Sequence, residues 1–353
     1  MSDSGKLSHI RKVLLIKLRY IGDAVLVTPL LTSLKAALPN ASLDFLVSKV
    51  AADILVDQPH INLVYSFDKK KGATSFLRLI RRLRAQDYDL VIDLTNNDRS
   101  MLFSRLSGAR WRIGFRNRHR LLQRFVYSRV IDSDFGHIHT VDHHLKVAEE
   151  LGLAIIDRHP FLAVSDKSVE RIRCILSRYD IEVTKGYIAI YPGARRWYKS
   201  WPSRNFAALA DRIVDRYGAS VVFIGGEQDR PVVRQILNEM QNTGVNLAGE
   251  LGLRDLPAFL KMASCLVGND SAPIHVATAV KTPVIALFGP TDARAWGPRR
   301  KHDITISADF PCKPCGHKNP DCPLGQDYCM STIKVEQVWE AVERVFKTPA
   351  SCQ

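Results

Sequence analysis

The sequence of 353 residues lacks a long hydrophobic run. The apolar stretch that begins at Val13 is interrupted at Lys17 and Arg19. A membrane-spanning helix needs about 18 apolar residues in succession, and a signal peptide needs a longer apolar core than this one. No internal repeat is visible in the sequence, which excludes solenoid architectures. We therefore expect a soluble, cytoplasmic protein.

Acidic residues are scarce relative to basic ones. Asp and Glu number 36 against 50 Lys and Arg, which gives a formal net charge of +14. Such an excess suggests an anionic partner, which could be nucleic acid, a membrane surface or a phosphorylated substrate. Hydrophobic residues make up 46% of the chain, too many for a disordered protein. At roughly 100–200 residues per domain, the length favours two domains with separate cores.

Two series of alternating strand and helix patterns follow one another along the chain. Short apolar runs typical of buried strands lie at 13–16, 43–47, 90–92, 187–191, 221–224, 265–267 and 284–288. Helical spacing is clearest at 24–34, 206–217 and 335–346. We predict an α/β fold with two Rossmann-like, doubly wound domains that face a central cleft. Residues 1–165 form the first domain, 166–185 a linker region, and 186–353 the second domain.

The first candidate functional residue is Asp23, which follows the first strand at the start of a helix. Ligands of doubly wound sheets bind beyond the carboxyl ends of the strands, so a carboxylate there could act as a general base. Lys17 and Arg19 flank Asp23 and would keep it ionised and attract anions. The alternative is that Asp23 only caps the helix, because Asp is favoured at that position.

A basic and aromatic segment, from Tyr191 to Pro202, follows the first strand of the second half. It contains Arg195, Arg196 and Lys199 together with aromatic residues and a glycine. Arginine makes bidentate contacts and lysine acts as a point charge, so the segment suits a pyrophosphate and a ring. A solvated basic loop is the alternative.

Two glycines and an acidic residue follow the next strand of the second half. Gly225 and Gly226 would allow close approach of the backbone, and Glu227 could accept hydrogen bonds from a nucleotide base or ribose. A plain turn explains the same residues. No strand here is followed by the G-x-G-x-x-G pattern of dinucleotide-binding enzymes, which disfavours an oxidoreductase.

The segment from Gly268 to His275 combines a strand end, small residues and a helix start. The N–H groups of Ser271 and Ala272, with the helix dipole, would form a seat for an anion. Asp270 would lie beside that seat and could bind sugar hydroxyls. In the alternative interpretation Asp270 or Ser271 is an ordinary helix cap, and His275 is a core histidine.

Candidate metal ligands give weak patterns. Asp87 and Asp89 form a D-x-D pair, but the pair precedes a strand, so we interpret it as a surface feature and predict no catalytic metal. Four of the seven cysteines cluster at positions Cys312, Cys315, Cys322 and Cys329. They include one C-x-x-C, but the later gaps of six residues lie outside common zinc spacings. A metal site and unpaired structural thiols both stay open.

Together these loops resemble the glycosyltransferase family 9 heptosyltransferases of bacterial lipopolysaccharide synthesis. The motifs that carry the resemblance are Lys17-Leu18-Arg19-Tyr20-Ile21-Gly22-Asp23, Ala194-Arg195 with Lys199-x-Trp201, Asp270-Ser271-Ala272-Pro273-x-His275, and Phe288-Gly289-Pro290-Thr291-Asp292. The similarity runs from about Val13 to about Val345. It is greatest to the heptosyltransferase III branch, which adds the side-branch heptose of the inner core.

The resemblance implies a GT-B fold with an N-terminal acceptor domain and a C-terminal donor domain. It also implies metal-independent, inverting transfer from the donor substrate ADP-L-glycero-β-D-manno-heptose, with no cofactor. Asp23 matches the family's catalytic base and Lys199 its donor-phosphate lysine. We assign the donor to Arg195, Gly225, Gly226, Glu227, Asp270, Ser271, Ala272 and His275, of which Arg195 stands where several family members have a hydroxyl residue.

The stretch from Arg99 to Arg129 contains nine arginines and no acidic residue. We expect the acceptor, a lipid-anchored and phosphorylated core oligosaccharide, to bind Lys17, Arg19, Arg110, Arg112 and Arg116. The same stretch would meet the anionic inner leaflet and make the protein peripheral on the inner face of the inner membrane. The alternative for this stretch is a solvated basic face.

Two other functions compete with the heptosyltransferase interpretation. One is a different GT-B nucleotide-sugar transferase or an epimerase, which would share the same fold and loops. The other is a basic nucleic-acid-binding protein, although the sequence shows no recognition module or stacking platform, so we expect no nucleic-acid partner.

Overall fold

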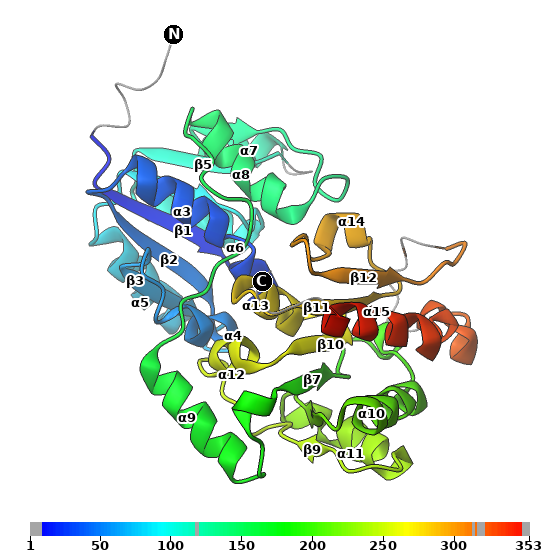
Figure 1. The fold of residues 1–353 in the computed structure, drawn as a ribbon. Coiled ribbons are helices and arrows are strands. Elements are labelled where there is room, and N and C mark those ends of the chain that lie inside the picture. The colour runs from blue at the N-terminus through cyan, green and yellow to red at the C-terminus, as the bar shows by residue number, and fades with distance from the viewer. Residues whose placement is uncertain (1–8, 117–119, 313–314, 316–321, 348–353) are drawn as a thin grey trace. The chain divides into compact units, whose positions relative to one another are not determined.

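The computed structural model describes residues 9–116, 120–312, 315 and 322–347 (Figure 1). The chain divides into two compact units, Met1–Leu162 and Ala163–Gln353. Each unit contains one six-stranded sheet in which all strands are parallel. Helices connect the strands in both units. The expected pair of parallel α/β domains is therefore confirmed.

The first unit has the strand order β3-β2-β1-β4-β5-β6. Its strands are β1 (Lys12–Lys17), β2 (Ser42–Ser48), β3 (Leu63–Phe67), β4 (Leu90–Asp93), β5 (Trp111–Phe115) and β6 (Arg129–Ile131). Its helices are α2 (Ile21–Val25), α3 (Thr28–Ala37), α4 (Lys49–Ala52), α5 (Gly72–Arg84), α6 (Asp98–Leu106), α7 (Arg120–Val126) and α8 (Thr140–Glu150).

The core of this unit is built around the central strand β1. Residues 13–17 of β1 are all buried, as expected of a strand covered on both faces. Leu14 and Ile16 pack in one cluster with Leu83 of α5 and Phe103 of α6. Helices α3 and α8 pack against each other. Side chains alternate along a strand, so residues on either side of Leu14 point to the opposite face.

The helix expected at 24–34 is two helices. Helix α2 ends at Val25, and α3 begins at Thr28 with Pro29 in its first turn. Proline has no N–H to donate to a preceding turn, but it is well suited to the start of a helix, where the N–H groups have no partner. A second helix therefore begins near Pro29, and α2 is a short separate helix that carries Asp23.

The second unit has the strand order β12-β11-β10-β7-β8-β9. Its strands are β7 (Tyr187–Tyr191), β8 (Ser220–Phe223), β9 (Val245–Asn246), β10 (Cys265–Asn269), β11 (Val284–Phe288) and β12 (Ile304–Ser307). Its helices are α9 (Asp166–Ser177), α10 (Ser203–Tyr217), α11 (Arg230–Glu239), α12 (Leu256–Met262), α13 (Ala272–Ala279), α14 (Ala293–Trp296) and α15 (Val335–Lys347). Helix α10 packs against both α11 and α15.

Both sheets share the same topology. Counted from the start of each unit, the strands lie in the order third, second, first, fourth, fifth, sixth. The chain direction across the sheet reverses between the first and fourth strands, which are β1 and β4 in one unit and β7 and β10 in the other. Ligands of such sheets bind at this reversal, beyond the carboxyl ends of the strands. The loops after these four strands are therefore where functional residues are expected.

Residues 166–185, predicted to be a linker region, fall within the second unit. They include helix α9, which packs against α12. The Arg171 guanidinium donates to the Asp255 carboxylate, with Nε 3.0 Å from Oδ1. The apolar side of α9 is buried at Ile172 and Leu176. The charged composition of this stretch therefore reflects the solvent-facing side of an amphipathic helix.

Candidate active site

In the first unit, Asp23 lies beyond the carboxyl end of β1, as expected. It is in the first turn of α2, and its Oδ1 is 3.3 Å from Nζ of Lys17. The N-cap of α2 is Tyr20, so the alternative in which Asp23 caps the helix is wrong. The Asp23 side chain is 13% exposed, which leaves its carboxylate within reach of a ligand.

Lys17 is buried, and all its protons have acceptors inside the unit. Besides the Asp23 carboxylate, Nζ contacts the Leu94 carbonyl at 3.1 Å and Nε2 of His144 at 3.2 Å. Burial lowers the pKa of Lys17, and the Asp23 carboxylate opposes that shift. Lys17 was expected to bind the acceptor, but the structure places it in the interior as the partner that holds Asp23.

The segment just before α2 contains one residue with a strained backbone and two exposed side chains. Tyr20, just before α2, has a φ of 23°, a conformation that costs a non-glycine residue free energy. Arg19 and Tyr20 are both exposed, so Arg19 is free to meet a ligand in solution. Strain of this kind is concentrated at functional loops, and here it sets the direction in which the chain enters α2.

A buried carboxylate that the sequence analysis missed supports the same edge of the sheet. Asp93 ends β4 and accepts hydrogen bonds from the N–H groups of Thr95 and Asn96, both at 2.9 Å, and from the Tyr127 hydroxyl at 2.7 Å. Burial raises the pKa of Asp93. Because these bonds fix the loop after β4, they also fix the Leu94 carbonyl, which accepts a hydrogen bond from Nζ of Lys17.

The arginines expected to bind the acceptor lie at different edges of the sheet. In the register of the sheet, Gly114 of β5 pairs with Asp93, which pairs with Ile16 of β1. Arg116 therefore follows the carboxyl end of β5, on the same edge as Asp23. Arg110 precedes β5 and lies at the opposite edge. The structure does not bring Arg110 together with Asp23.

Arg112 and Arg116 already have partners within the first unit. The Arg112 guanidinium donates to the backbone carbonyls of Ala109 and Val126, and burial lowers its pKa. Arg116 forms a bidentate ion pair with Asp132, and both side chains are exposed. Arg112 therefore serves the fold, whereas Arg116 remains accessible to an anionic ligand in exchange for Asp132.

In the second unit, three predicted loops meet at Lys199. Its Nζ is 3.0 Å from Oδ2 of Asp270 and 2.6 Å from Oγ1 of Thr291. Lys199 comes from a short 3₁₀ helix (Trp197–Lys199) after β7, while Asp270 and Thr291 follow β10 and β11. A cation, a carboxylate and a hydroxyl thus converge beyond the carboxyl ends of neighbouring strands.

Asn269, which the sequence analysis did not select, ties the loops after β7 and β10 together. It is fully buried, and its Oδ1 accepts from the Trp201 N–H at 3.0 Å while its Nδ2 donates to the Pro192 carbonyl at 2.8 Å. The Trp201 indole N–H in turn donates to the Ile333 carbonyl at 2.9 Å. This amide therefore sets the position of the whole segment that carries Lys199.

Helix α13 begins beside Asp270. Ser271 is its N-cap, but the Ser271 hydroxyl donates to the Asn269 carbonyl at 3.0 Å rather than serving the helix N–H groups. The first turn, with Ala272 and Pro273, is therefore left to an external acceptor or solvent. His275 is buried in α13, which favours the core alternative for this residue.

The glycine loop after β8 is shaped by Asp229, a third residue that the sequence analysis missed. Its Oδ2 accepts from the Gly226 N–H at 2.8 Å. A Cβ at Gly225 would lie 2.6 Å from Cβ of Asp229, and one at Gly193 would lie 2.7 Å from Asp229 Oδ1. Burial raises the pKa of Asp229. The two glycine positions are therefore required by close packing around one carboxyl group.

Glu227 and Arg195 are the exposed members of the predicted donor set. The Glu227 carboxylate is 3.0 Å from Nε of Arg230 and its side chain is 73% exposed. Arg195 lies on the exposed part of the loop after β7. Because both side chains are exposed, both are accessible for contacts with a ligand.

The D-x-D pair serves the fold of the first unit. Asp89 Oδ2 accepts from the N–H groups of Arg11 and Lys12, at 2.7 and 2.9 Å, and so anchors the start of β1. Tyr88, which lies between the two aspartates, is buried, and its hydroxyl donates to the Asp44 carboxylate at 2.6 Å. Within the described ranges, no three His, Cys, Asp or Glu side chains are placed to hold a metal ion.

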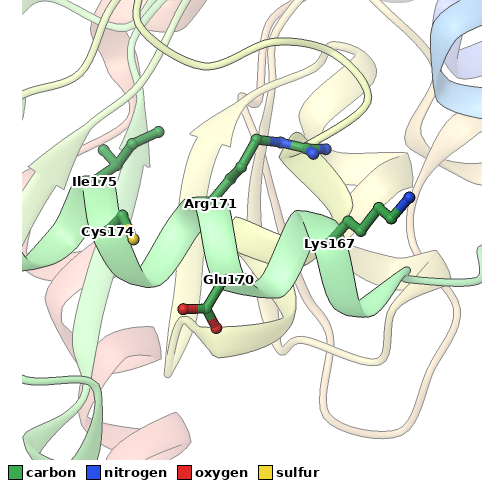
Figure 2. Close-up of a pocket in the computed structure, with 5 residues that line it drawn as sticks. All are labelled: Lys167, Glu170, Arg171, Cys174 and Ile175. Atoms are coloured by element: carbon green, nitrogen blue, oxygen red, sulfur yellow. The ribbon is translucent and has the colours of Figure 1, made fainter.

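A pocket of about 450 Å³ lies along α9, away from these loops. Figure 2 shows that its lining side chains all come from this one helix and point in different directions. Arg171, one of them, is already paired with Asp255. The pocket contains none of the predicted site residues, and we do not assign it to the active site.

Comparisons with known proteins identify the family of the chain. A family model described as "Glycosyltransferase family 9 (heptosyltransferase)" matches residues 76–324. Lipopolysaccharide heptosyltransferase 3 of Escherichia coli strain K12 is 32% identical over 348 residues, which cover 94% of this chain and 97% of that protein.

Solved structures show the same fold. A glycosyltransferase family 9 protein of Veillonella parvula matches with a TM-score of 0.83 at 25% identity, over 95% of this chain and 97% of that one. The E. coli ADP-heptose lipopolysaccharide heptosyltransferase II matches with a TM-score of 0.77 at 23% identity, over 95% and 98% of the two chains. Heptosyltransferases of this kind have the GT-B fold, so the expected fold class is confirmed.

Proposed function

Because the chain belongs to glycosyltransferase family 9, the heptosyltransferases, we propose that it transfers L-glycero-D-manno-heptose from ADP-heptose to the inner core of lipopolysaccharide. Family membership confirms the expectation of a glycosyltransferase, and the nucleic-acid alternative is not retained. In the proposed reaction an acceptor hydroxyl attacks the anomeric carbon, the bond to ADP breaks, and the configuration at that carbon inverts.

Asp23 is the proposed general base. An alcohol is a weak nucleophile at neutral pH, so a positioned carboxylate must take its proton as the new bond forms. The ion pair with Lys17 at 3.3 Å keeps the carboxylate oriented. Asp23 is only partly buried, so one side of the carboxylate remains accessible for the acceptor hydroxyl.

Lys199 is the proposed partner of the leaving diphosphate. The charge that grows on the departing ADP needs cations and N–H dipoles that are already in place. Lys199 supplies the cation, and the first turn of α13 at Ser271 and Ala272 supplies N–H groups. Asp270 is then released to accept hydrogen bonds from hydroxyls of the donor sugar, and Arg195 lies on the same loop as Lys199.

The proposed chemistry does not require a catalytic metal ion, because the protein provides the positive charge at the diphosphate. Added Mg²⁺ should therefore leave the rate of transfer unchanged. A rate that depended on Mg²⁺ would show that Lys199 and the helix start do not suffice.

The acceptor is proposed to approach through the basic part of the first unit. Among the described residues no helix is long and apolar enough to cross a lipid bilayer. Helix α7 instead exposes Leu122 (58%) and Phe125 (70%) beside Arg124, within the arginine-rich stretch 99–129. Exposed apolar side chains among cations suit the surface of an anionic membrane, so we propose peripheral attachment to the inner face of the inner membrane.

The observation that carries the proposal is the convergence of Lys199, Asp270 and Thr291 in a chain of this family. The test is to incubate the protein with ADP-heptose and core lipopolysaccharides lacking heptose units at graded positions. We expect ADP release and a product heavier by one heptose with one of these acceptors. Thermal stabilisation by UDP but not ADP would instead favour another nucleotide-sugar enzyme, since only a ligand of the folded state raises the midpoint.

A further inference from the structure

A buried histidine of α8, His144, contacts the chain on both sides of the proposed base. Its Nε2 is 3.2 Å from Nζ of Lys17, the last residue of β1. Its Nδ1 is 3.1 Å from the carbonyl oxygen of Leu26, the C-cap of α2. Asp23 lies between these two contacts in the sequence. One imidazole ring therefore bridges the residue that precedes the α2 turn and the residue that follows it.

Helix α2 needs support from other elements. It is five residues long, and isolated helices shorter than about 12–15 residues are marginal in water. It also follows Tyr20, whose φ of 23° costs free energy. Contacts with the rest of the unit therefore have to keep Asp23 in one position.

Packing alone does not explain a histidine at position 144. The residues one turn away on α8 are apolar and buried, namely Val141, Val147 and Ala148. An apolar side chain would fill the space of His144 without removing two polar nitrogens from water. Each nitrogen of the buried ring has a hydrogen-bond partner, which offsets that cost. The nitrogens of the ring, rather than its bulk, distinguish this position from its neighbours.

The Leu26 carbonyl selects the tautomer of the ring. A carbonyl oxygen can only accept a hydrogen bond, so Nδ1 of His144 carries the proton. Burial lowers the pKa of His144 well below its usual value, so the ring is neutral. Nε2 is then an acceptor, which is the form that a lysine can bind.

Lys17 connects the ring to Asp23. An ammonium group has three N–H donors, and Nζ of Lys17 has three acceptors in Nε2 of His144, the Leu94 carbonyl and the Asp23 carboxylate. Loss of the His144 acceptor would leave one N–H unpaired in a buried site. The ammonium group would then have to move or lose its proton. Either change alters the contact with Asp23.

We propose that His144 is a positioning residue for transfer, whose Nε2 fixes Lys17, and that Lys17 in turn fixes the Asp23 carboxylate for the acceptor hydroxyl. The inference rests on the proposed function of Asp23 as the general base. His144 exchanges no proton with a substrate in this role, because both of its nitrogens stay bonded within the protein. Its contribution is geometric, and displacing a catalytic group by about 1 Å can slow a reaction about 10²-fold.

Two substitutions separate the two nitrogens of the ring. The amide of Asn lies as many bonds from Cβ as Nδ1 does, so His144→Asn keeps a donor for Leu26 but has no acceptor for Lys17. The amide of Gln lies one bond further, as Nε2 does, so His144→Gln provides an acceptor for Lys17 but no donor for Leu26. Each variant loses one buried hydrogen bond, so both should lose similar stability in urea unfolding.

The two variants should nevertheless differ in the rate of transfer. With saturating ADP-heptose and heptose-deficient core lipopolysaccharide, kcat should fall about 10–100-fold in His144→Asn and stay within about threefold of wild type in His144→Gln. The affinity for ADP should be unchanged in both. A wild-type kcat in His144→Asn would overturn the proposal. Equal losses of kcat in the two variants would do the same, because a purely structural role predicts them.

His143→Asn is the matched control, since it is the same substitution at the adjacent position of α8. His143 is also buried, but its Nδ1 is 2.7 Å from the Ser133 hydroxyl and its ring packs on Phe115. This variant should lose stability and keep the kcat of the wild type. A loss of kcat as large as in His144→Asn would contradict a specific role for His144.

A double substitution tests whether His144 acts through Lys17. Lys17→Met removes the ammonium group and should slow transfer. Adding His144→Asn to it should slow transfer no further, because two residues that act as one chain of contacts have non-additive effects. Additive losses would show that His144 acts by another route and would overturn the proposal.

Crystal structures separate this inference from the proposed reaction. The Lys17–Asp23 ion pair should be present in the wild type and in His144→Gln and absent in His144→Asn. If His144→Asn fails to fold, the ¹⁵N chemical shifts of the wild-type ring decide, since a proton on Nε2 would overturn the inference. A wild type with the ion pair intact but no heptose transfer would refute the proposed function and leave the contact between His144 and Lys17 standing.

Discussion

Lys17 donates a hydrogen bond to His144, and the geometry of the imidazole fixes its direction. Nδ1 of His144 lies 3.1 Å from the Leu26 carbonyl, which can only accept, so Nδ1 carries the proton. In the neutral ring Nε2 is then an acceptor, and Lys17 at 3.2 Å must be its donor. The buried ammonium group of Lys17 thus donates its three hydrogen bonds to the Leu94 carbonyl, Nε2 of His144 and the Asp23 carboxylate.

The lowered pKa values of the neighbouring histidines His143 and His144 predict how the stability of the protein depends on pH. Burial lowers the pKa of His143 to about 3 and that of His144 well below its usual value. In the unfolded chain both imidazoles have a pKa near 6.5. Below that pH the unfolded state therefore binds more protons than the folded state does. Stability should therefore fall as the pH drops from about 7 to about 4, by up to about 1.4 kcal/mol per pH unit for each histidine.

Urea unfolding at several pH values checks this expectation. His143→Phe keeps the contact with the Phe115 ring, whose centroid is 3.9 Å away, and removes one titrating group. The variant should lose stability less steeply on acidification than the wild type. His137→Gln, at an exposed position, serves as the control. Equal slopes for His143→Phe and wild type would contradict the prediction.

Replacing Asp23 tests the proposed base. Asp23→Asn keeps the size of the side chain and removes the carboxylate, so transfer should slow by about 10²–10⁴-fold. ADP binding should stay unchanged by calorimetry, because Lys199 and Asp270 lie in the other unit. Asp53→Asn, an exposed substitution in the same unit, should retain full activity. Near wild-type turnover by Asp23→Asn would remove this residue from the role.

Thr291 is expected to act through the lysine it contacts. Thr291→Val keeps the shape but removes the hydroxyl 2.6 Å from Nζ of Lys199, so the ammonium loses one of its two fixed acceptors. One hydrogen bond contributes about 0.5–1.5 kcal/mol, so ADP affinity should fall roughly 2–10-fold. Thr243→Val, at an exposed site, is the matched control. Lower stability with unchanged ADP affinity would limit Thr291 to a role in the fold.

Gly114 is expected to be intolerant of a side chain. A Cβ there would lie 2.5 Å from the Tyr127 ring, whose hydroxyl is held by Asp93. The ring cannot move without breaking that bond, so Gly114→Ala should destabilise the first unit by about 1–3 kcal/mol in urea unfolding. At Gly252 a Cβ would meet nothing nearer than 3.7 Å, and Gly252→Ala should be close to neutral. Comparable stability of both variants would contradict this packing argument.

The exposed side of α7 predicts binding to lipid. Leu122→Ser combined with Phe125→Ser should weaken sedimentation with phosphatidylglycerol vesicles by roughly tenfold or more, because each side chain loses its transfer into an apolar phase. ADP binding should not change. Leu77→Ser removes a similarly exposed apolar residue from α5 and should leave vesicle binding intact. Equal binding by wild type and the double variant would refute α7 as the attachment surface.

The site residues that the sequence analysis proposed lie in segments that follow buried strands. Asp23, Lys199 and Asp270 each follow a continuous apolar run, and the topology of a parallel sheet places such residues along one edge. Edge strands were harder to find: β3, β6, β9 and β12 are short or partly exposed and lack such a run. Their pairing depends on the neighbouring strand, which a local pattern does not contain.

The residues that support the site could not be predicted in the same way. Lys17 contacts His144, which is 127 positions away in the chain, and Asn269 fixes Trp201 and Pro192 from 68 and 77 positions away. Asp93 and Asp229 are ordinary acidic residues in the sequence and become buried acceptors only in the folded chain. Their roles arise from long-range hydrogen bonds, for which no local spacing gives a signal.

The ion pair between Lys199 and Asp270 has a consequence for selectivity. At rest the positive charge of Lys199 is matched by a carboxylate 3.0 Å away, so a simple anion such as phosphate gains little by approaching it. A ligand gains more when it takes the ammonium and also gives Asp270 new hydrogen-bond donors. On the proposed function the nucleotide sugar meets both conditions at once, with its diphosphate and its hydroxyls. We therefore expect the Lys199–Asp270 pair to favour binding of the nucleotide sugar over binding of inorganic anions.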